Sequence, residues 1–226
     1  MDVVPRFSPF EPAFASYSGE IPESFKEQFL HSPDDPFHIV LDGHMDVWFR
    51  PKWLYPLFWA LEKVGILVSE TGKDIPVKLV LKAKYDKNNR PVHYWNRTFQ
   101  FKNERYFNTV LPYDYEHKDV GDFIGKWKFV YIVWEARYHP PKRFTLDTKL
   151  CALQIGNRFI WLPKWMWERL FGVLHCDQVA HDLKGKTYDL DLVIRHPWFG
   201  DVFGYRGKFQ AIRVPKESTK VGGGYR

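Results

Sequence analysis

Alternation of apolar and polar side chains marks residues 77–85. Leu79, Leu81 and Ala83 fall on one face, while lysines occupy the other, as expected of a strand with one buried face. A turn rich in Asn then leads into a second alternating run, 92–101. The two runs are predicted to form an antiparallel hairpin, because a slip of one residue would bury the lysines.

The same alternation recurs along most of the chain, first over residues 37–49. Further strands are predicted at 105–111, 127–138, 144–153, 159–162, 174–182, 187–195 and 202–213. Because short turns rather than helices join them, they indicate an antiparallel sheet. We therefore expect an α+β fold, with a strongly curved antiparallel sheet of roughly ten strands that is barrel-like or clam-like.

Residues 53–68 are apolar on almost every side and favour a helix that the curved sheet grips, with Leu57, Leu61 and Val64 in the core. A helix that lies on a membrane surface is the alternative. Two shorter helices are expected. One begins near Pro22 and ends before Ser32-Pro33, and the other runs from Lys164 to Phe171 between a proline and a glycine.

The 226 residues, 45% of them hydrophobic, suit one large domain. Residues 1–20 carry aromatic side chains among Pro, Ser and Gly, which predicts an extended arm lying on the body. The domain itself is expected over 21–215, and the Gly-rich residues 216–226 are expected to form a flexible tail.

The distribution of charge and of cysteines bears on two questions: whether the protein binds nucleic acid, and where in the cell it is expected. The 33 basic and 27 acidic residues alternate along the strands rather than gathering on one face, so we expect no nucleic-acid partner. Cys151 and Cys176 form neither a CxxC pair nor a disulfide framework, and the first residues lack the pattern of a signal peptide. A cytoplasmic location is the resulting expectation.

Arg97 is the most informative single residue. Alternation places it on the same strand face as Trp95 and Phe99. A guanidinium in an aromatic wall needs a negative charge, because unpaired burial costs several kcal/mol. Two partners are open: an acidic ligand, or a carboxylate of the protein, for which the candidates are Glu135, Asp177 and Asp189. The remaining alternative is that this face of the strand is exposed to water.

Other candidate chemistry is weaker. Two sets of side chains at strand spacing could approach a metal ion, but such spacing is equally that of a solvated face, and no metal site, cofactor or catalytic residue is expected. These sets are Asp42, His44 and Asp46, and His175, Asp177 and His181. Tyr131 and Tyr205 lie among aromatic residues on predicted strands and are taken as candidate ligand contacts beside Arg97.

Several short patterns, weak individually, occur in a specific order. They are Ile21-Pro22, Gly43, Gly72-x-Asp74-Ile75-Pro76-Val77, Trp95-x-Arg97-x-Phe99, Tyr188-Asp189-Leu190 and Pro197-x-x-Gly200 followed by Tyr205-x-Gly207. In these residues, from about Ile21 to Phe209, the chain resembles the uncharacterised bacterial family known as domain of unknown function 4166. Members of that family are often joined to the C-terminal side of saccharopine-dehydrogenase-like proteins. This chain has no GxGxxG motif, so the resemblance implies no reductase activity.

Three functional classes follow from these observations. Aromatic residues make up 18% of the chain, which suits the walls of an apolar cavity, so the leading hypothesis is a non-enzymatic protein that binds a hydrophobic or acidic amphiphilic small molecule. The alternative is an interaction or scaffold module that acts with a partner enzyme or at a membrane surface. An enzyme of unknown reaction is the third.

Overall fold

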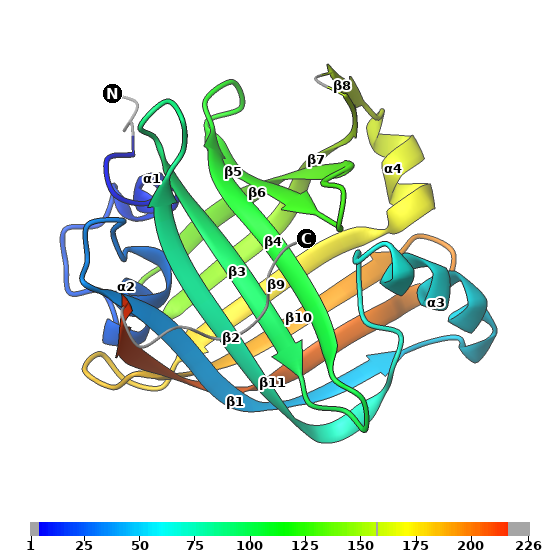
Figure 1. Ribbon diagram of the computed structural model, residues 1–226, viewed down its shortest axis with the longest axis horizontal. Helices are drawn as coiled ribbons and strands as arrows, with labels where there is room; N and C mark the ends of the chain where they lie inside the picture. The colour runs from blue at the N-terminus through cyan, green and yellow to red at the C-terminus, as the bar shows by residue number, and fades with distance from the viewer. Residues whose placement is uncertain (1–4, 157, 217–226) are drawn as a thin grey trace.

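The computed structural model describes residues 5–156 and 158–216, and within them eleven strands form one antiparallel sheet (Figure 1). The strands are β1 (Phe37–Phe49), β2 (Gly72–Tyr85), β3 (Pro91–Phe99), β4 (Arg105–Asp114), β5 (Asp119–Ile124), β6 (Val130–His139), β7 (Arg143–Ile155), β8 (Arg158–Trp161), β9 (Val173–Ala180), β10 (Thr187–His196) and β11 (Gly200–Pro215).

Ten of these strands close into a barrel. Each pairs with the next along the chain from β1 to β7, β9 then follows β7, and β11 returns to pair with β1. Strand β8 is added outside the ring, on the C-terminal part of β7. This up-and-down order confirms the predicted curved antiparallel sheet, and closure pairs the two strands that would otherwise be free edges.

The β2–β3 hairpin has the predicted register. Leu79 pairs with Arg97, and Leu81 pairs with Trp95. Leu79, Leu81 and Ala83 are buried, while Lys78, Lys82 and Lys84 lie on the outer face. The alternation therefore determines which face of β3 looks into the barrel, and with it the direction of Arg97.

Two glycines permit the tight approach of β1 and β11. A Cβ atom on Gly43 would lie 2.0 Å from the carbonyl oxygen of Lys208, and one on Gly207 would lie 2.0 Å from that of His44. Any larger residue would push the two strands apart, since real side chains do not tolerate such distances.

One end of the barrel is closed from within. Helices α1 (Glu11–Phe14) and α2 (Glu23–Phe29) bring four buried rings into this end: Phe10, Phe14, Phe25 and Phe29. Ser8 Oγ donates a hydrogen bond to the carbonyl of Phe29 and joins the two segments. The predicted extended arm is thus partly helical and contributes to the core. Of the predicted tail, residues 217–226 lie outside the described residues.

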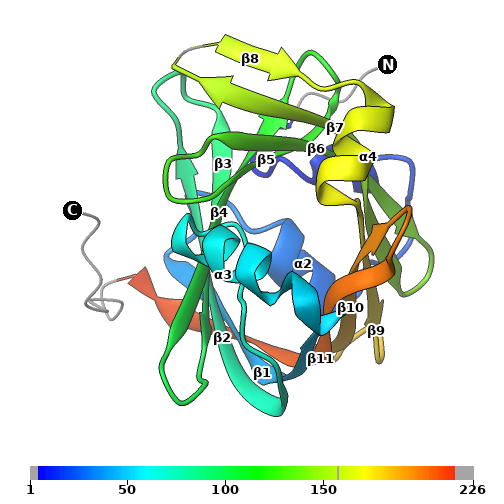
Figure 2. The same cartoon turned by 90° about the vertical axis from the view of Figure 1, so that its right-hand side faces the viewer.

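The opposite end carries the short 3-10 helix η1 (Lys52–Leu54) and the helices α3 (Tyr55–Lys63) and α4 (Lys164–Phe171), which flank its opening in Figure 2. The bounds of α4 are as predicted, whereas the helix predicted over 53–68 is shorter. Gly65, with φ of 76°, adopts the left-handed conformation that ends a helix. Leu57 is 50% exposed, so its predicted place in the core is wrong. Within this helix the buried side chain is Phe58.

Candidate functional site

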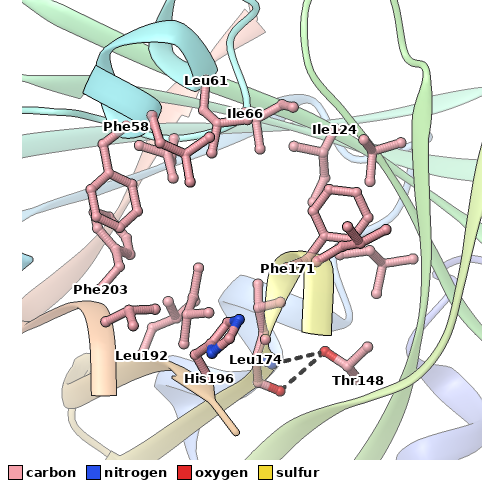
Figure 3. Close-up of a pocket in the computed structure, with 18 of the residues that line it drawn as sticks. Phe58, Leu61, Ile66, Ile124, Thr148, Phe171, Leu174, Leu192, His196 and Phe203 are labelled. Carbon is pink, nitrogen blue, oxygen red and sulfur yellow. Dashed lines mark hydrogen bonds between the residues drawn. The ribbon is translucent and has the colours of Figure 1, made fainter. Parts of the chain in front are cut away.

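A cavity of about 320 Å³ extends into the barrel from the end that carries α3 and α4. Figure 3 shows side chains from helices and strands on opposite sides converging on it, among them Phe58 and Leu61 of α3, Phe171 of α4 and Leu192 of β10. Its walls are mainly aliphatic and aromatic, and its size falls within the range of small-molecule sites.

One part of the cavity wall lies where the hydrogen bonding between β7 and β9 is interrupted. Pairing of β7 with β9 stops at Asp147, and α4 is inserted in the chain between these strands. There, the Thr148 hydroxyl donates to the carbonyl of Leu174 at 3.2 Å and accepts from its backbone N–H at 3.1 Å (Figure 3). A side chain thus replaces the missing ladder bonds and keeps this wall together.

The rim of the cavity is apolar and open to solvent. Five residues both line the cavity and are more than 40% exposed: Trp53, Leu57, Leu170, Trp198 and Phe199. His196 supports the rim from below. Its Nδ1 accepts from the backbone N–H of Trp198 at 3.2 Å, and its Nε2 donates to the carbonyl of Arg169 at 2.9 Å. Both contacts fit a neutral imidazole.

Arg97 lies at the inner end of the cavity and is 9% exposed. Its guanidinium carbon is 5.3 Å from the ring centre of Trp95 and 4.9 Å from that of Phe107. Nη1 donates to the Thr109 hydroxyl at 3.4 Å, which is its one hydrogen bond within the ranges 5–156 and 158–216. A guanidinium has five N–H donors, so most of its capacity to bind an anion remains for another acceptor.

Asp122, on β5, faces the same inner end. Its Oδ2 accepts a hydrogen bond from Trp134 Nε1 at 3.1 Å. Burial raises the pKa of this carboxyl to about 7, against the opposing effects of the Arg97 charge and the bond from Trp134. The site therefore carries a positive charge below neutral pH and is close to electrically balanced above it.

A smaller chamber of about 40 Å³ continues beyond Arg97 and Asp122 toward the closed end. Its lining contains buried polar atoms that have no hydrogen-bond partner in the described part of the chain. They are the side-chain amide of Gln28, Gln178 Oε1, the Tyr188 hydroxyl, Trp95 Nε1 and Asp122 Oδ1. Buried polar groups are normally bonded, so this chamber favours a polar group beside the apolar cavity.

The predicted ligand-contact residues lie in three places. Arg97, Phe99 and Tyr205 line the cavity, and Trp95 lines the inner chamber. Tyr131 lies elsewhere, in a separate cluster on the outer side of β6 that includes Val133 and Ala152. Alternation along β6 explains the difference, because Val130, Ile132 and Trp134 are the residues that reach the cavity.

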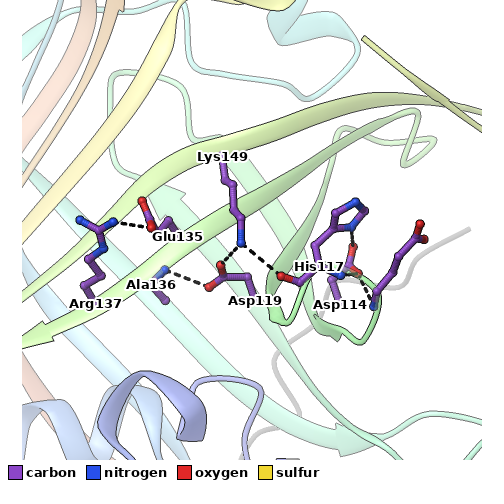
Figure 4. A network of polar contacts seen from close by, with 8 residues as sticks. Asp114, His117, Asp119, Glu135, Ala136, Arg137 and Lys149 are labelled. Carbon is purple, nitrogen blue, oxygen red and sulfur yellow. Dashed lines mark hydrogen bonds and ion pairs between the residues drawn. The ribbon is translucent and has the colours of Figure 1, made fainter. Parts of the chain in front are cut away.

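The three carboxylates considered as partners of Arg97 each pair elsewhere. Glu135 pairs with Arg137 (Figure 4), Asp177 accepts from Arg143 Nε at 2.8 Å, and Asp189 lies 3.1 Å from His181 Nε2. Figure 4 also shows Lys149 joining Asp119 to the backbone of His117 beside this pair. In place of the three predicted carboxylates, the carboxylate that shares the cavity with Arg97 is Asp122.

The other candidate groups do not converge. The Asp42, His44 and Asp46 set lies on β1, whereas the His175, Asp177 and His181 set belongs to β9 and the turn that follows. Strands β10 and β11 lie between the two sets. Burial raises the pKa of the Cys151 and Cys176 thiols to about 12, so both stay protonated at neutral pH. In the described ranges no helix is long and apolar enough to span a membrane.

Asp122, Thr109, Trp134 and His196 were not singled out from the sequence. The signal for Asp122 is present, because a lone carboxylate interrupts the apolar run Val120-Gly121-Asp122-Phe123-Ile124. In the structure this run belongs to β5, a strand of only six residues, and the sequence pattern predicted no strand there.

Fold and site together define a closed up-and-down β-barrel with an internal, mainly apolar cavity open at one end. The chain belongs to the family described as domain of unknown function DUF4166, whose model matches residues 21–209, which confirms the resemblance seen in the sequence. It is also similar to the uncharacterized protein YndH of Bacillus subtilis (strain 168), with 29% identity over 155 residues that cover 66% of this chain and 73% of YndH. No solved structure matches the chain.

Proposed function

We propose that this protein is a non-enzymatic binding protein for an acidic amphiphile, a small molecule with an apolar body and an anionic head group. The apolar body occupies the cavity between α3, α4 and the barrel wall. The head group lies at the inner end, against the guanidinium of Arg97. The observation that carries this proposal is an apolar cavity of about 320 Å³ with the buried Arg97 guanidinium at its base, most of whose N–H donors are free to bind an anion.

The arrangement of charge supports an anion rather than a neutral ligand. Arg97 is flanked by two aromatic rings and bonded to a single neutral hydroxyl, so its charge is only partly compensated by Asp122. The unpartnered atoms of Gln28 and Tyr188 lie just beyond and supply donors to the same region. A carboxylate, sulfonate or phosphate would satisfy several of these donors at once.

The proposal is tested with a fluorescent amphiphile. Anilinonaphthalene sulfonate stays anionic across the accessible pH range, and its emission rises in apolar surroundings. Leu192→Trp adds bulk at a side chain that points into the cavity (Figure 3), and we expect it to weaken binding of the probe at least tenfold. Val193→Trp adds the same bulk to the neighbouring residue of β10, which does not line the cavity, and serves as the matched control.

Equal affinity of the two variants would show that the probe binds outside the cavity and would contradict the proposal. Native mass spectrometry of protein purified without detergent provides a second measurement. We expect a co-purifying mass that is absent from Leu192→Trp and retained by Val193→Trp.

A further inference from the structure

The exposed tryptophans of this protein lie at one end of the barrel. Of ten in the chain, six are exposed. They are Trp53, Trp59, Trp127, Trp161, Trp165 and Trp198, and all belong to η1, α3, α4, β8 or the turns beside them. Figure 2 shows α3, α4 and β8 at this end of the barrel, and Trp161 of β8 also packs against Tyr131 on the outer side. A soluble surface seldom gathers so much aromatic area without a partner, and tryptophan is the residue most typical of membrane–water interfaces.

Basic side chains accompany these tryptophans. The segments 52–63, 125–129, 158–171 and 197–199 contain seven Lys or Arg and only two Glu. Both glutamates are paired, Glu62 with Arg105 at 3.0 Å and Glu168 with Lys164 at 3.8 Å. We call these four segments the mouth face. Its charge is complementary to a negatively charged surface.

The aromatic and basic side chains of the mouth face contact one another across its segments. Trp53 packs edge to face against Phe199, with ring centres 5.2 Å apart. Arg169 lies over two rings, 5.6 Å from Trp165 on its own helix and 5.5 Å from Trp198 on the β10–β11 turn. Side chains of three of the four segments, 52–63, 158–171 and 197–199, are therefore in contact with one another rather than isolated.

We infer that the mouth face binds the surface of an anionic lipid bilayer, with the tryptophans at the level of the head groups and the lysines and arginines against their phosphates. A bilayer is favoured over a protein partner because the surface combines interfacial tryptophan with unbalanced positive charge around an open apolar cavity. The inference goes beyond ligand binding and does not depend on it. If both hold, an amphiphile can pass between bilayer and cavity without crossing water.

Vesicle sedimentation tests this inference. The full chain is mixed with vesicles of phosphatidylcholine alone, or of phosphatidylcholine and phosphatidylglycerol in equal parts. We expect binding to the anionic vesicles, with a shift of tryptophan emission to shorter wavelength. Binding should fall when salt is raised from 0.1 to 1 M, which shortens the screening length from about 10 to about 3 Å.

Two variants locate the contact. Lys126→Gln with Lys128→Gln should lower vesicle partitioning by roughly fivefold per lysine. Replacing Trp59, Trp127 and Trp165 by Ser leaves the cavity lining intact and should reduce the emission shift, to which the remaining Trp53 and Trp198 still contribute. The matched control, Lys87→Gln with Lys184→Gln, removes the same charge from exposed positions at the closed end and should bind as the wild type does.

No binding of the wild type to anionic vesicles at low salt would overturn the inference, as would equal losses in the control and the mouth variants. Neither result would bear on anilinonaphthalene sulfonate binding in the cavity. The two proposals therefore fail separately.

Discussion

The two ends of the barrel use the same kind of residue in opposite ways. At the closed end, Phe10, Phe25 and Phe29 are fully buried and pack against one another and against the barrel wall. At the open end, Trp53 and Trp198 are 63% and 65% exposed and ring a cavity. Aromatic content alone thus predicts neither stability nor function. A ring is buried only where another element covers it. At the closed end, the N-terminal segments provide that cover.

The largest contrast is expected in stability. Phe29→Ala removes a fully buried ring from the closed end and should lower the free energy of unfolding by about 3–5 kcal/mol. Leu57→Ala, at the open end, removes a half-exposed side chain and should change it by about 0.5 kcal/mol or less. Urea denaturation midpoints of the two variants measure the difference. Similar losses would show that the open end is as tightly packed as the closed one.

The second contrast concerns how stability depends on pH. His31 and His93 are buried together at the closed end, with ring centres 4.2 Å apart, and burial lowers the pKa of His31 to about 4. Below the ordinary pKa of 6.5, His31 binds a proton in the unfolded chain but stays neutral in the folded protein. The free energy of unfolding therefore falls as pH is lowered from 6.5 to 4. The loss is on the order of 3 kcal/mol.

Asp122 acts in the opposite direction over the same range, because its raised pKa makes the folded state bind the extra proton. The test therefore compares variants rather than one curve. His31→Gln should lose less stability than the wild type between pH 7 and 4, and Asp122→Asn should lose more. Parallel pH profiles for all three proteins would contradict the assignment.

The smallest effect is expected at the base of the cavity. Because the pKa of Asp122 is raised to about 7, its negative charge appears as pH rises through that value, and an anionic ligand should then bind more weakly. Anilinonaphthalene sulfonate should lose roughly tenfold in affinity, which is the effect of one pKa unit. In Asp122→Asn the affinity should stay constant across neutral pH. A pH dependence that persists in this variant would assign the titration to another group.

Much of the fold could be predicted, because alternation of apolar and polar residues is a strong signal where one face of a strand is buried and the other is exposed to solvent. Leu79, Leu81 and Arg97 all point where the pattern of β2 and β3 directs them. The bounds of α4 were also predicted, from a proline and a glycine at its ends. In these places local sequence and tertiary environment agree.

The direction of a side chain could not be predicted where apolar residues occupy both faces of an element. It also could not be predicted where burial depends on residues far away in the sequence. Tyr131 and Ile132 both belong to an apolar run, so the pattern does not say which of the two faces the cavity. In the structure Ile132 faces the cavity, and Tyr131 is covered on the outer side by Phe159 and Trp161 of β8. Leu57 belongs to an apolar run of which Leu54 and Phe58 are buried, whereas Leu57 itself is half exposed beside the cavity. The role of Asp122 likewise depends on Arg97, which comes from another strand.

The pairing of β1 with β11 has a consequence for how the protein is made. Phe37 lies opposite Pro215, so the ring closes only when chain segments at opposite ends of the sequence meet. During synthesis, the hairpins from β1 to β10 emerge in order, yet β1 and β10 keep unpaired edges until Gly200–Pro215 has left the ribosome. Such non-local closure is slow, and it makes the nascent chain prone to aggregation until its last strand is available.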